Sequence, residues 1–343
     1  MKHTKGDLAQ MQSLPLSAKI LMTKRRIRDW YDYWDGQVYV SFSGGKDSTV
    51  LLHIARELYP DIEAVFVNTG LEYPEIQSFV KTFDNVTILR PKMRFDEVIK
   101  TYGYPIISKE VSQAIWYAQK GSSWAVNQLN GRDHHGNPHE FKASMYCKYK
   151  PLCDVDFKVS NKCCLVMKEK PLYEIEKEKK PITAIMASES KKRETAWLMT
   201  GCNAFDSKKP MSKPMSFWTE QDVLQYIKEN NIPIASVYGD VVYKEDSDQM
   251  RIEDYGIDGC GTDKLCTTGL DRTGCIFCAF GAHLEKGESR FERLKRTHPR
   301  QYEYCIGGGE YVNGVWQPSK EGLGMGHVFD ELNKIYGYGF INY

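Results

Sequence analysis

An unbroken string of six residues, Ser43-Gly44-Gly45-Lys46-Asp47-Ser48, has the composition of a phosphate-binding turn. Its glycines let backbone N–H groups converge on an anion, and its serines and Lys46 supply further hydrogen-bond donors. The string follows a β-branched and aromatic run at residues 38–42 and precedes an apolar stripe of helical spacing, so it opens a helix. It lacks the glycine spacing and the Gly-Lys-Ser/Thr ending of a Walker A loop. We therefore predict a strand, a glycine turn and a helix that together hold a phosphate group.

Four of the ten cysteines have the spacing of a metal or cluster site. Cys163 and Cys164 are adjacent, and Cys275 and Cys278 form a later CxxC. Four thiolates are the ligand set of a [4Fe–4S] cluster or of a structural Zn²⁺ ion. Residues 268–274, just before the CxxC, favour a tight metal-binding turn. Three other cysteines can replace Cys163 in this set: Cys202, Cys260 and Cys266.

The composition excludes several classes of protein. A chain of 343 residues is long enough for roughly two domains, and ten cysteines are too few for a small disulfide scaffold. Lys and Arg total 46 against 45 Asp and Glu, a net charge of +1, so any nucleic-acid-binding surface must be local. One candidate is the basic segment after the CxxC: Arg290, Arg293, Lys295, Arg296 and Arg300.

The amino end predicts neither a signal peptide nor a membrane partner. Its first apolar cluster, residues 20–22, is interrupted at once by Lys24, Arg25 and Arg26. No apolar run approaches the roughly 20 residues of a spanning helix. We therefore expect a cytoplasmic, reducing location, where clustered cysteines more often indicate metal or redox chemistry than disulfides.

Alternating apolar patterns predict the elements that hold these residues. Strands are expected at residues 38–42, 62–67, 86–89 and 182–187, and helices after the glycine turn and at residues 74–83 and 190–199. Thr219 and Asp222 form a capping box that opens another helix. Repeated strand–helix units favour an α/β fold: a mostly parallel twisted sheet with helices on both faces, Rossmann-like, plus a small cysteine-rich carboxy-terminal region.

The same pass along the chain predicts three parts. Residues 1–34 form an amphipathic amino-terminal helix, and residues 35–237 form the nucleotide-binding α/β domain. An insertion of little periodicity interrupts this domain at about residues 121–161. Residues 238–343, with frequent glycines and weak periodicity, form the cysteine-rich region.

The glycine turn resembles the PP-loop of the ATP pyrophosphatases, the adenine nucleotide α-hydrolase-like superfamily. Three further strings resemble the phosphoadenosine phosphosulfate (PAPS) reductase family within it: residues 66–70, residues 187–190 with Arg193, and residues 214–223. The resemblance covers about residues 38–278 and implies binding of ATP, or of the adenylyl sulfates APS and PAPS, with chemistry at the α-phosphate. It implies these nucleotide-binding residues: Ser41, Ser43, Gly44, Gly45, Ser48, Thr69, Gly70 and Glu189.

The resemblance also implies catalytic roles for Lys46, Asp47 and Arg193. Arg193 can neutralise a polyphosphate bidentately, and Asp47 can hold Mg²⁺ or orient the loop. In assimilatory APS reductases of this family, a Cys-Cys pair and a later CxxC bind a [4Fe–4S] cluster. The similarity thus makes Cys163, Cys164, Cys275 and Cys278 the expected ligands, with Zn²⁺ as the alternative.

Two enzymatic functions are compatible with these residues. An APS or PAPS reductase needs a nucleophilic cysteine, which family reductases carry in a carboxy-terminal tail; here residues 306–343 hold no cysteine, and Cys305 is the only substitute. We therefore favour an ATP pyrophosphatase-type enzyme that adenylates an acceptor to support sulfur transfer. Its expected partners are a nucleic-acid acceptor and a cysteine desulfurase or other sulfur donor. A third hypothesis is a non-catalytic nucleotide-sensing module.

Overall fold

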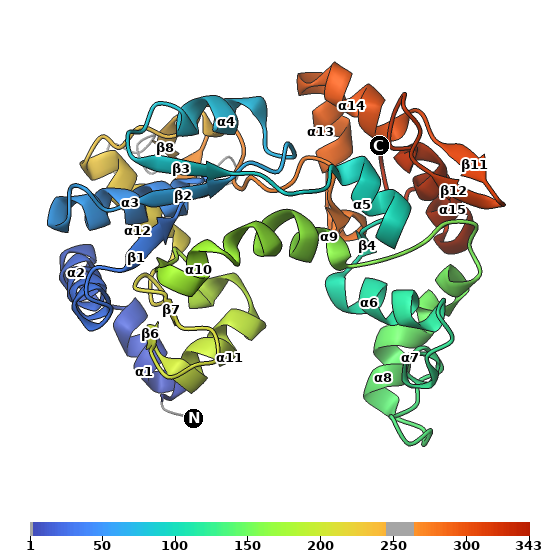
Figure 1. Cartoon of the computed structure of the whole chain (residues 1–343), viewed down its shortest axis with the longest axis horizontal. Helices are drawn as coiled ribbons and strands as arrows, with labels where there is room; N and C mark the ends of the chain where they lie inside the picture. The colour runs from blue at the N-terminus through green and yellow to red at the C-terminus, as the bar shows by residue number, and fades with distance from the viewer. Residues whose placement is uncertain (1–2, 245–263) are drawn as a thin grey trace, which may run out of the picture. The chain divides into compact units, whose positions relative to one another are not determined.

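The computed structural model describes residues 3–244 and 264–343 (Figure 1). The chain divides into two compact units. Unit 1 comprises Met1–Asn68, Glu72–Leu89 and Leu172–Thr273, and unit 2 comprises Thr69–Leu71, Arg90–Pro171 and Gly274–Tyr343. The sequence boundaries at residues 34/35 and 237/238 stay a prediction.

Unit 1 contains a six-stranded sheet in the order β3-β2-β1-β5-β7-β6. Its strands are β1 (Val38–Ser41), β2 (Ala64–Val67), β3 (Val86–Leu89), β5 (Lys180–Ile182), β6 (Asn203–Ala204) and β7 (Met211–Ser212). All neighbours pair in parallel except β6 with β7. A helix follows each of β1 and β2 and returns the chain to the same end of the sheet, as repeated strand–helix units require, whereas from β3 the chain continues into unit 2. The mostly parallel sheet with its helices confirms the predicted α/β class.

The helices of unit 1 are α1 (Lys5–Gln12), α2 (Leu16–Tyr33), α3 (Lys46–Leu58), α4 (Pro74–Val80), α10 (Ile175–Glu178), α11 (Lys191–Thr200) and α12 (Glu220–Glu229). Helices α3, α4 and α11 lie close to the predicted positions. The single helix predicted over residues 1–34 is wrong, because α1 and α2 are separate helices and Pro15 is the N-cap of α2, and α10 was not predicted. The capping box that opens α12 is formed, because the Thr219 side chain accepts from the Asp222 N–H and Asp222 accepts from the Thr219 N–H. The described part of unit 1 also holds two short 3₁₀ turns, η4 (Ala187–Glu189) and η5 (Ser236–Tyr238), and a hairpin of β8 (Val241–Tyr243) with β9 (Leu265–Thr267).

Helix α2 is anchored in unit 1 through polar groups. Lys19, only 2% exposed, places its Nζ 2.7 Å from the Asp222 carboxylate of α12. One turn further along, Thr23 Oγ1 accepts a 2.9 Å hydrogen bond from the Trp218 indole. Buried polar groups are tolerated when they are paired in this way, so the amino-terminal helix is an integral part of unit 1.

The strand predicted at residues 182–187 is wrong beyond its first residue. Strand β5 ends at Ile182, and Ala187 begins the 3₁₀ turn η4. The Glu189 side chain accepts a 3.0 Å hydrogen bond from the Met186 N–H, and the Ala187 N–H bonds to the Ser216 carbonyl. An apolar run does not reveal such a side-chain cap, which bends the chain away from the sheet.

Unit 2 is mainly helical. It contains α5 (Phe95–Tyr102), α6 (Lys109–Ala118), α7 (Ser123–Leu129), α8 (Glu140–Tyr146), α9 (Lys162–Cys164), α13 (Arg290–Thr297), α14 (Pro299–Ile306) and α15 (Met325–Tyr336). Strand β4 (Ile106–Ile107) pairs in parallel with β10 (Ala279–Phe280), and β11 (Glu310–Val312) forms a hairpin with β12 (Val315–Gln317). The insertion at residues 121–161 is therefore more regular than its sequence suggests, because α7 and α8 are too short to show a helical period.

None of the helices within residues 3–244 and 264–343 combines the length and the apolar character needed to cross a membrane.

Candidate functional site

The phosphate loop, residues 43–48, lies between β1 and α3 in unit 1, as predicted. Ser48 Oγ lies 3.0 Å from Ser43 Oγ and accepts a 3.2 Å hydrogen bond from the Ser43 N–H. Ser48 and Thr49 both donate to the Gly45 carbonyl, at 2.9 and 3.0 Å. Ser41 ends β1 immediately before the loop. These bonds fix the loop at the N-terminus of α3, where backbone N–H groups favour an anion.

Gly44 is required by two separate features. Its φ is +73°, and a Cβ at this position would lie 2.8 Å from both the Ile76 and the Val80 side chains of α4. A side chain here would be strained and would also collide with α4. The close approach of this helix therefore depends on glycine at position 44.

Lys46 is already paired. Its Nζ lies 2.7 Å from Glu220 Oε1, at the start of α12, and 5.9 Å from the centre of the Tyr238 ring. The Lys46 side chain is 4% exposed, whereas that of Glu220 is 50% exposed. The buried ammonium thus has an accessible carboxylate as its partner.

Asp47 is the unsatisfied group of the site. Its Oδ1 is buried, and it has no hydrogen-bond partner within the described part of the chain. Burial raises the pKa of this carboxyl, although the charges of Lys46, Arg272 and Arg193 act in the opposite direction. An unpartnered buried oxygen is costly in a folded protein and is typical of a position that meets a ligand.

Glu189 holds two arginines together. Its Oε2 pairs with Arg193, from the first turn of α11, and accepts a 2.9 Å hydrogen bond from Arg272. Burial and the neighbouring Arg272 lower the pKa of Arg193. The structure thus brings Arg193 and Glu189 of the predicted site together with Asp47, whose ionisation both arginines favour.

Sequence reasoning missed three residues of this cluster: Glu220, Tyr238 and Arg272. Tyr238 is buried and its hydroxyl lies 2.6 Å from Thr273 Oγ1, on the side of Gly45 where a Cβ would meet it at 3.2 Å. Arg272 immediately precedes Thr273, inside the stretch interpreted as a metal-binding turn. A cationic side chain within a glycine-containing loop was the feature of the sequence that could have indicated Arg272 as a site residue.

Thr69 and Gly70, two further predicted nucleotide-binding residues, belong to unit 2. Thr69 Oγ1 accepts a 3.1 Å hydrogen bond from the Leu71 N–H, and Gly70 has a φ of +75°. They form a tight turn, and their predicted role in nucleotide binding stays a proposal.

The four predicted cysteine ligands line one narrow cavity of unit 2. Cys163 and Cys164 come from α9, and Cys275 and Cys278 from the turn before β10. Leu71, Phe95 and Met167 provide apolar walls, and Lys168 also lines the cavity. The topology therefore joins the CC pair and the CxxC, as their spacing predicts.

The two adjacent thiols are electrostatically unequal. Their sulfurs are 4.0 Å apart. The hydrogen bond from Cys163 lowers the pKa of Cys164 to about 6, aided by the charges of Lys109 and Lys168, whereas the same bond and burial raise the pKa of Cys163. Nearby lysines thus favour thiolate, the form that binds metals.

Among residues 3–244 and 264–343, no group of three or more His, Cys, Asp or Glu side chains is placed to hold a metal ion. The [4Fe–4S] cluster, or the alternative Zn²⁺ ion, that the sequence predicts at these four cysteines therefore stays a proposal.

The other cysteines of the described residues do not line this cavity. Cys202 is buried in unit 1, where burial raises its pKa, and Cys266 lies in β9 of the same unit. Cys260 lies outside the described residues. Cys305 is completely buried, its thiol is 3.5 Å from Met325 Sδ, and burial raises its pKa.

The basic segment after the CxxC is largely neutralised within unit 2. Arg290 pairs with Glu285 and donates to the Cys278 carbonyl. Arg293 and Arg296 both bind Glu288, whose pKa they lower to about 2. This segment is therefore a weaker phosphate-binding surface than its composition suggests.

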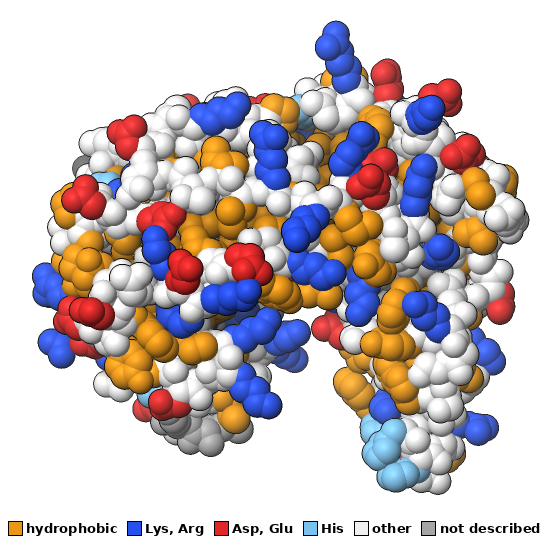
Figure 2. All heavy atoms as spheres, viewed as in Figure 1, with side chains coloured by type: hydrophobic (Ala, Val, Ile, Leu, Met, Phe, Trp, Pro, Cys, Tyr) orange, Lys and Arg blue, Asp and Glu red, His pale blue; other side chains and the backbone are white. Residues whose placement is uncertain are grey.

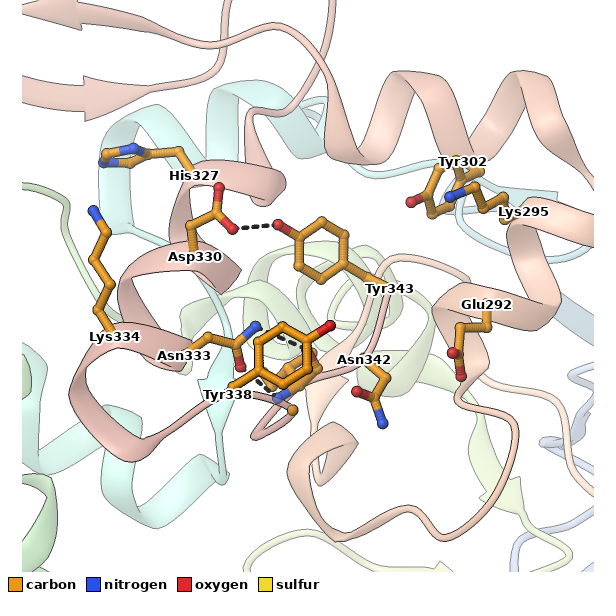
Figure 3. A pocket seen from close by; sticks show the side chains of 12 residues that line it. Glu292, Lys295, Tyr302, His327, Asp330, Asn333, Lys334, Tyr338, Asn342 and Tyr343 are labelled. Atoms are coloured by element: carbon orange, nitrogen blue, oxygen red, sulfur yellow. Dashed lines mark hydrogen bonds between the residues drawn. The ribbon is translucent and has the colours of Figure 1, made fainter.

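A polar groove of about 690 Å³ lies between α13, α15 and the last residues of the chain (Figure 3). Asp330 and Tyr343 point toward each other across it, and the Tyr343 hydroxyl donates at 2.5 Å. Asn333 exchanges two hydrogen bonds with the Ile341 backbone. These polar groups hold the carboxy-terminal residues in place.

Several known proteins are similar to this chain in sequence. An uncharacterized protein of Methanocaldococcus jannaschii is 23% identical over 288 residues, which cover 82% of this chain and 50% of that protein. An adenosine 5′-phosphosulfate reductase of Bacillus cereus is 22% identical over 210 residues, 59% of this chain and 68% of the relative. This chain spans about half the length of the archaeal relative.

A solved structure, the phosphoadenylyl-sulfate reductase of Candida auris in complex with phosphate, aligns with 76% of this chain and 96% of its own, at 15% identity and a TM-score of 0.36. The model of the phosphoadenosine phosphosulfate reductase domain matches residues 37–120 and 126–279. These ranges make up most of the chain and include the phosphate loop, both arginines and all four cysteines of the cavity. The chain therefore belongs to the phosphoadenosine phosphosulfate reductase domain family.

Proposed function

We propose that this protein is a PP-loop enzyme that binds ATP in unit 1 and adenylates an acceptor to prepare it for sulfur transfer. An acceptor oxygen attacks the α-phosphorus and forms a new P–O bond. The bond to the bridging oxygen breaks, pyrophosphate leaves with the electron pair, and the acceptor proton passes to solvent. A sulfur nucleophile from a donor then displaces AMP from the activated acceptor.

The observation that carries this proposal is the unsatisfied Asp47 oxygen beside the phosphate loop. Around it, three cations, Lys46, Arg193 and Arg272, alternate with the carboxylates of Asp47, Glu189 and Glu220. Because these charges already balance, a polyphosphate is best accommodated together with a divalent cation. Oxygen ligands such as the free Asp47 Oδ1 suit Mg²⁺.

Within this site the arginines provide the electrostatic stabilisation. Charge develops on the leaving pyrophosphate, and preorganised donors aimed at it lower the barrier. Arg193 and Arg272 are held by one carboxylate, so their guanidinium groups are fixed before the nucleotide arrives. The loop hydroxyls and N–H groups complete the set of donors.

We further propose that Cys163, Cys164, Cys275 and Cys278 bind a [4Fe–4S] cluster. The shared cavity, its apolar walls and the nearby lysines support this ligand set. When bound, such a cluster supplies redox-active, thiophilic iron. The chain's own contribution is to hold four thiolates together and to offset their charge.

The second candidate is an APS or PAPS reductase. The relatives named adenosine 5′-phosphosulfate reductase support it. The burial of Cys305 argues against it, because attack on the sulfate sulfur needs an accessible thiolate.

One experiment separates these functions. The anaerobically purified protein is incubated with ATP and Mg²⁺, and separately with APS or PAPS and a dithiol, and pyrophosphate and sulfite are measured. We expect pyrophosphate, and its loss in Asp47→Ala. Sulfite production that disappears in Cys305→Ser would establish the reductase instead. Nucleotide binding without either product would identify a sensing module.

A further inference from the structure

We propose that α6, α7 and α9 of unit 2 form a binding platform for single-stranded nucleic acid. The platform consists of Trp116, Tyr117 and Trp124 with Lys120 and Lys162. Because the platform would bind the acceptor of the proposed enzyme, this proposal rests on the proposed function. Binding of the nucleic acid to the platform itself requires neither ATP nor its cleavage.

The platform brings three aromatic rings into one continuous group. The Trp116 and Tyr117 ring centres are 4.6 Å apart and edge to face, and those of Tyr117 and Trp124 are 5.2 Å apart. Trp124 is 39% exposed, and Trp116 and Tyr117 are half-buried. Trp124, the most exposed of the three rings, can stack on an unpaired base without a large loss of conformational entropy, because it is anchored against Tyr117.

Two ammonium groups lie over these rings. Lys120 Nζ is 3.9 Å and Lys162 Nζ is 4.7 Å from the centre of the Trp116 ring, and Lys162 Nζ is also 5.9 Å from that of Tyr117. Within residues 3–244 and 264–343, neither lysine pairs with a carboxylate. No carboxylate of the described residues therefore competes with phosphates for these two ammonium groups, in contrast to Arg293 and Arg296, which share Glu288.

The surrounding sequence is basic, although the whole chain is nearly neutral. Residues 109–170 contain ten Lys or Arg and six Asp or Glu, a local excess of four positive charges. Lysine and arginine side chains lie among hydrophobic ones over the part of unit 2 that holds α6, α7 and α8 (Figure 2). Such interleaving of cations and apolar rings favours a polyanion with stacking bases over a neutral protein partner.

The platform is continuous with the cysteine cavity. Lys162 is the first residue of α9, and the next two residues, Cys163 and Cys164, line the cavity. A strand held by Lys162 would therefore lie beside the thiols within the same unit. The bases of a duplex are stacked on one another, so their faces are inaccessible to protein side chains. A single-stranded segment or a loop therefore suits the rings better than a double helix.

The test uses the full chain, without ATP, and fluorescence anisotropy of a labelled oligouridylate of about 12 nucleotides. We expect binding that weakens strongly between about 50 and 200 mM salt. Trp124→Ala should lower the affinity about tenfold, because one stacking ring is lost. The double variant Lys120→Gln/Lys162→Gln should lower both the affinity and the slope of log Kd against log salt, the slope by about 1.4, since each phosphate contact to a single strand contributes about 0.7.

A matched control removes two cations elsewhere in unit 2. Arg293→Gln/Arg296→Gln should bind the oligonucleotide like the parent, because these arginines are already paired. Equal losses in both double variants would overturn the platform, as would a duplex of the same length that binds equally well. Unchanged binding by a folded Trp124→Ala variant, checked by its melting curve, would also overturn it.

The outcome is separable from the proposed function. If the protein binds the oligonucleotide but releases no pyrophosphate, the platform is supported and the proposed adenylation is contradicted. If it releases pyrophosphate but binds no oligonucleotide at low salt, the platform alone is contradicted.

Discussion

The ammonium of Lys46 and the carboxylate of Glu220 lie 2.7 Å apart, although 174 residues separate them in the chain. The lysine side chain is buried and the glutamate is half exposed. An incoming phosphate must therefore compete with Glu220 for the lysine. The ion pair holds the loop in shape and also opposes anion binding.

Glu220→Gln should tighten ATP binding about fivefold, because it removes one negative charge near the phosphates while keeping an acceptor for Lys46. Isothermal titration calorimetry with Mg²⁺ and ATP measures the effect. Glu229→Gln, at the other end of α12, makes the same chemical change away from the loop and should have no effect. An unchanged or larger Kd in Glu220→Gln would show that the pair does not compete with the nucleotide.

Arg272→Gln should weaken ATP binding at least about tenfold and slow pyrophosphate release. The variant loses a charge-assisted donor and frees Glu189, which then has Arg193 as its remaining partner at this site. Arg28→Gln, on the exposed face of α2, serves as the control. Parent-like kinetics in Arg272→Gln would remove this residue from the site.

Asp47→Asn should stabilise the protein while abolishing turnover. Burial disfavours the ionised carboxylate, so a neutral side chain of the same shape should raise the melting temperature by a few degrees at neutral pH. Asp61→Asn, an exposed position, should leave the melting temperature unchanged. Calorimetry measures the melting temperature, and the pyrophosphate assay measures turnover. A melting temperature of Asp47→Asn below that of the parent would contradict the expected gain in stability.

Cys164→Ser and Cys275→Ser should each prevent cluster formation. After anaerobic incubation with iron and sulfide, the parent should show broad visible absorption and four iron atoms per chain, the content of one [4Fe–4S] cluster. The exposed Cys147 lies apart from the cavity, so Cys147→Ser should retain the colour. A colourless parent protein that binds one zinc ion per chain would show that these cysteines hold zinc and not a cluster.

Asp156→Asn tests a pH-dependent contact of unit 2. Burial raises the pKa of Asp156, but hydrogen bonds from Tyr311 and His327 outweigh it, and the net pKa lies below the ordinary value of 3.8. Its contribution to stability is therefore present above about pH 4 and is lost as the pH falls through the folded-state pKa. The variant should be less stable than the parent at pH 6 and nearly equal near pH 2. Asp154→Asn, which is exposed, should show no such difference at either pH.

Much of unit 1 follows from local signals in the sequence. Strand β3 begins and ends at the predicted residues, and the phosphate loop lies where its glycines and the flanking patterns place it. The capping box at Thr219 also forms as predicted. These features depend on neighbouring residues, so a single sequence contains the information.

The partners of the site residues could not be predicted in the same way. Glu220 reaches Lys46, and Arg272 reaches Glu189, only because distant segments fold against the same loop. Spacing also suggested a basic surface at residues 290–300, but Glu285 and Glu288 neutralise three of its arginines. Ion pairing depends on side-chain positions that periodicity does not encode.

Gly44 sets how closely α4 approaches the loop at residues 43–48. Helix α4 would meet a side chain at position 44 through Ile76 and Val80, and it also packs against η5, the turn that ends in Tyr238. One helix therefore adjoins both the loop and the turn that carries Tyr238. Larger side chains at positions 76 and 80 would push α4 away from the loop and would disturb both contacts together.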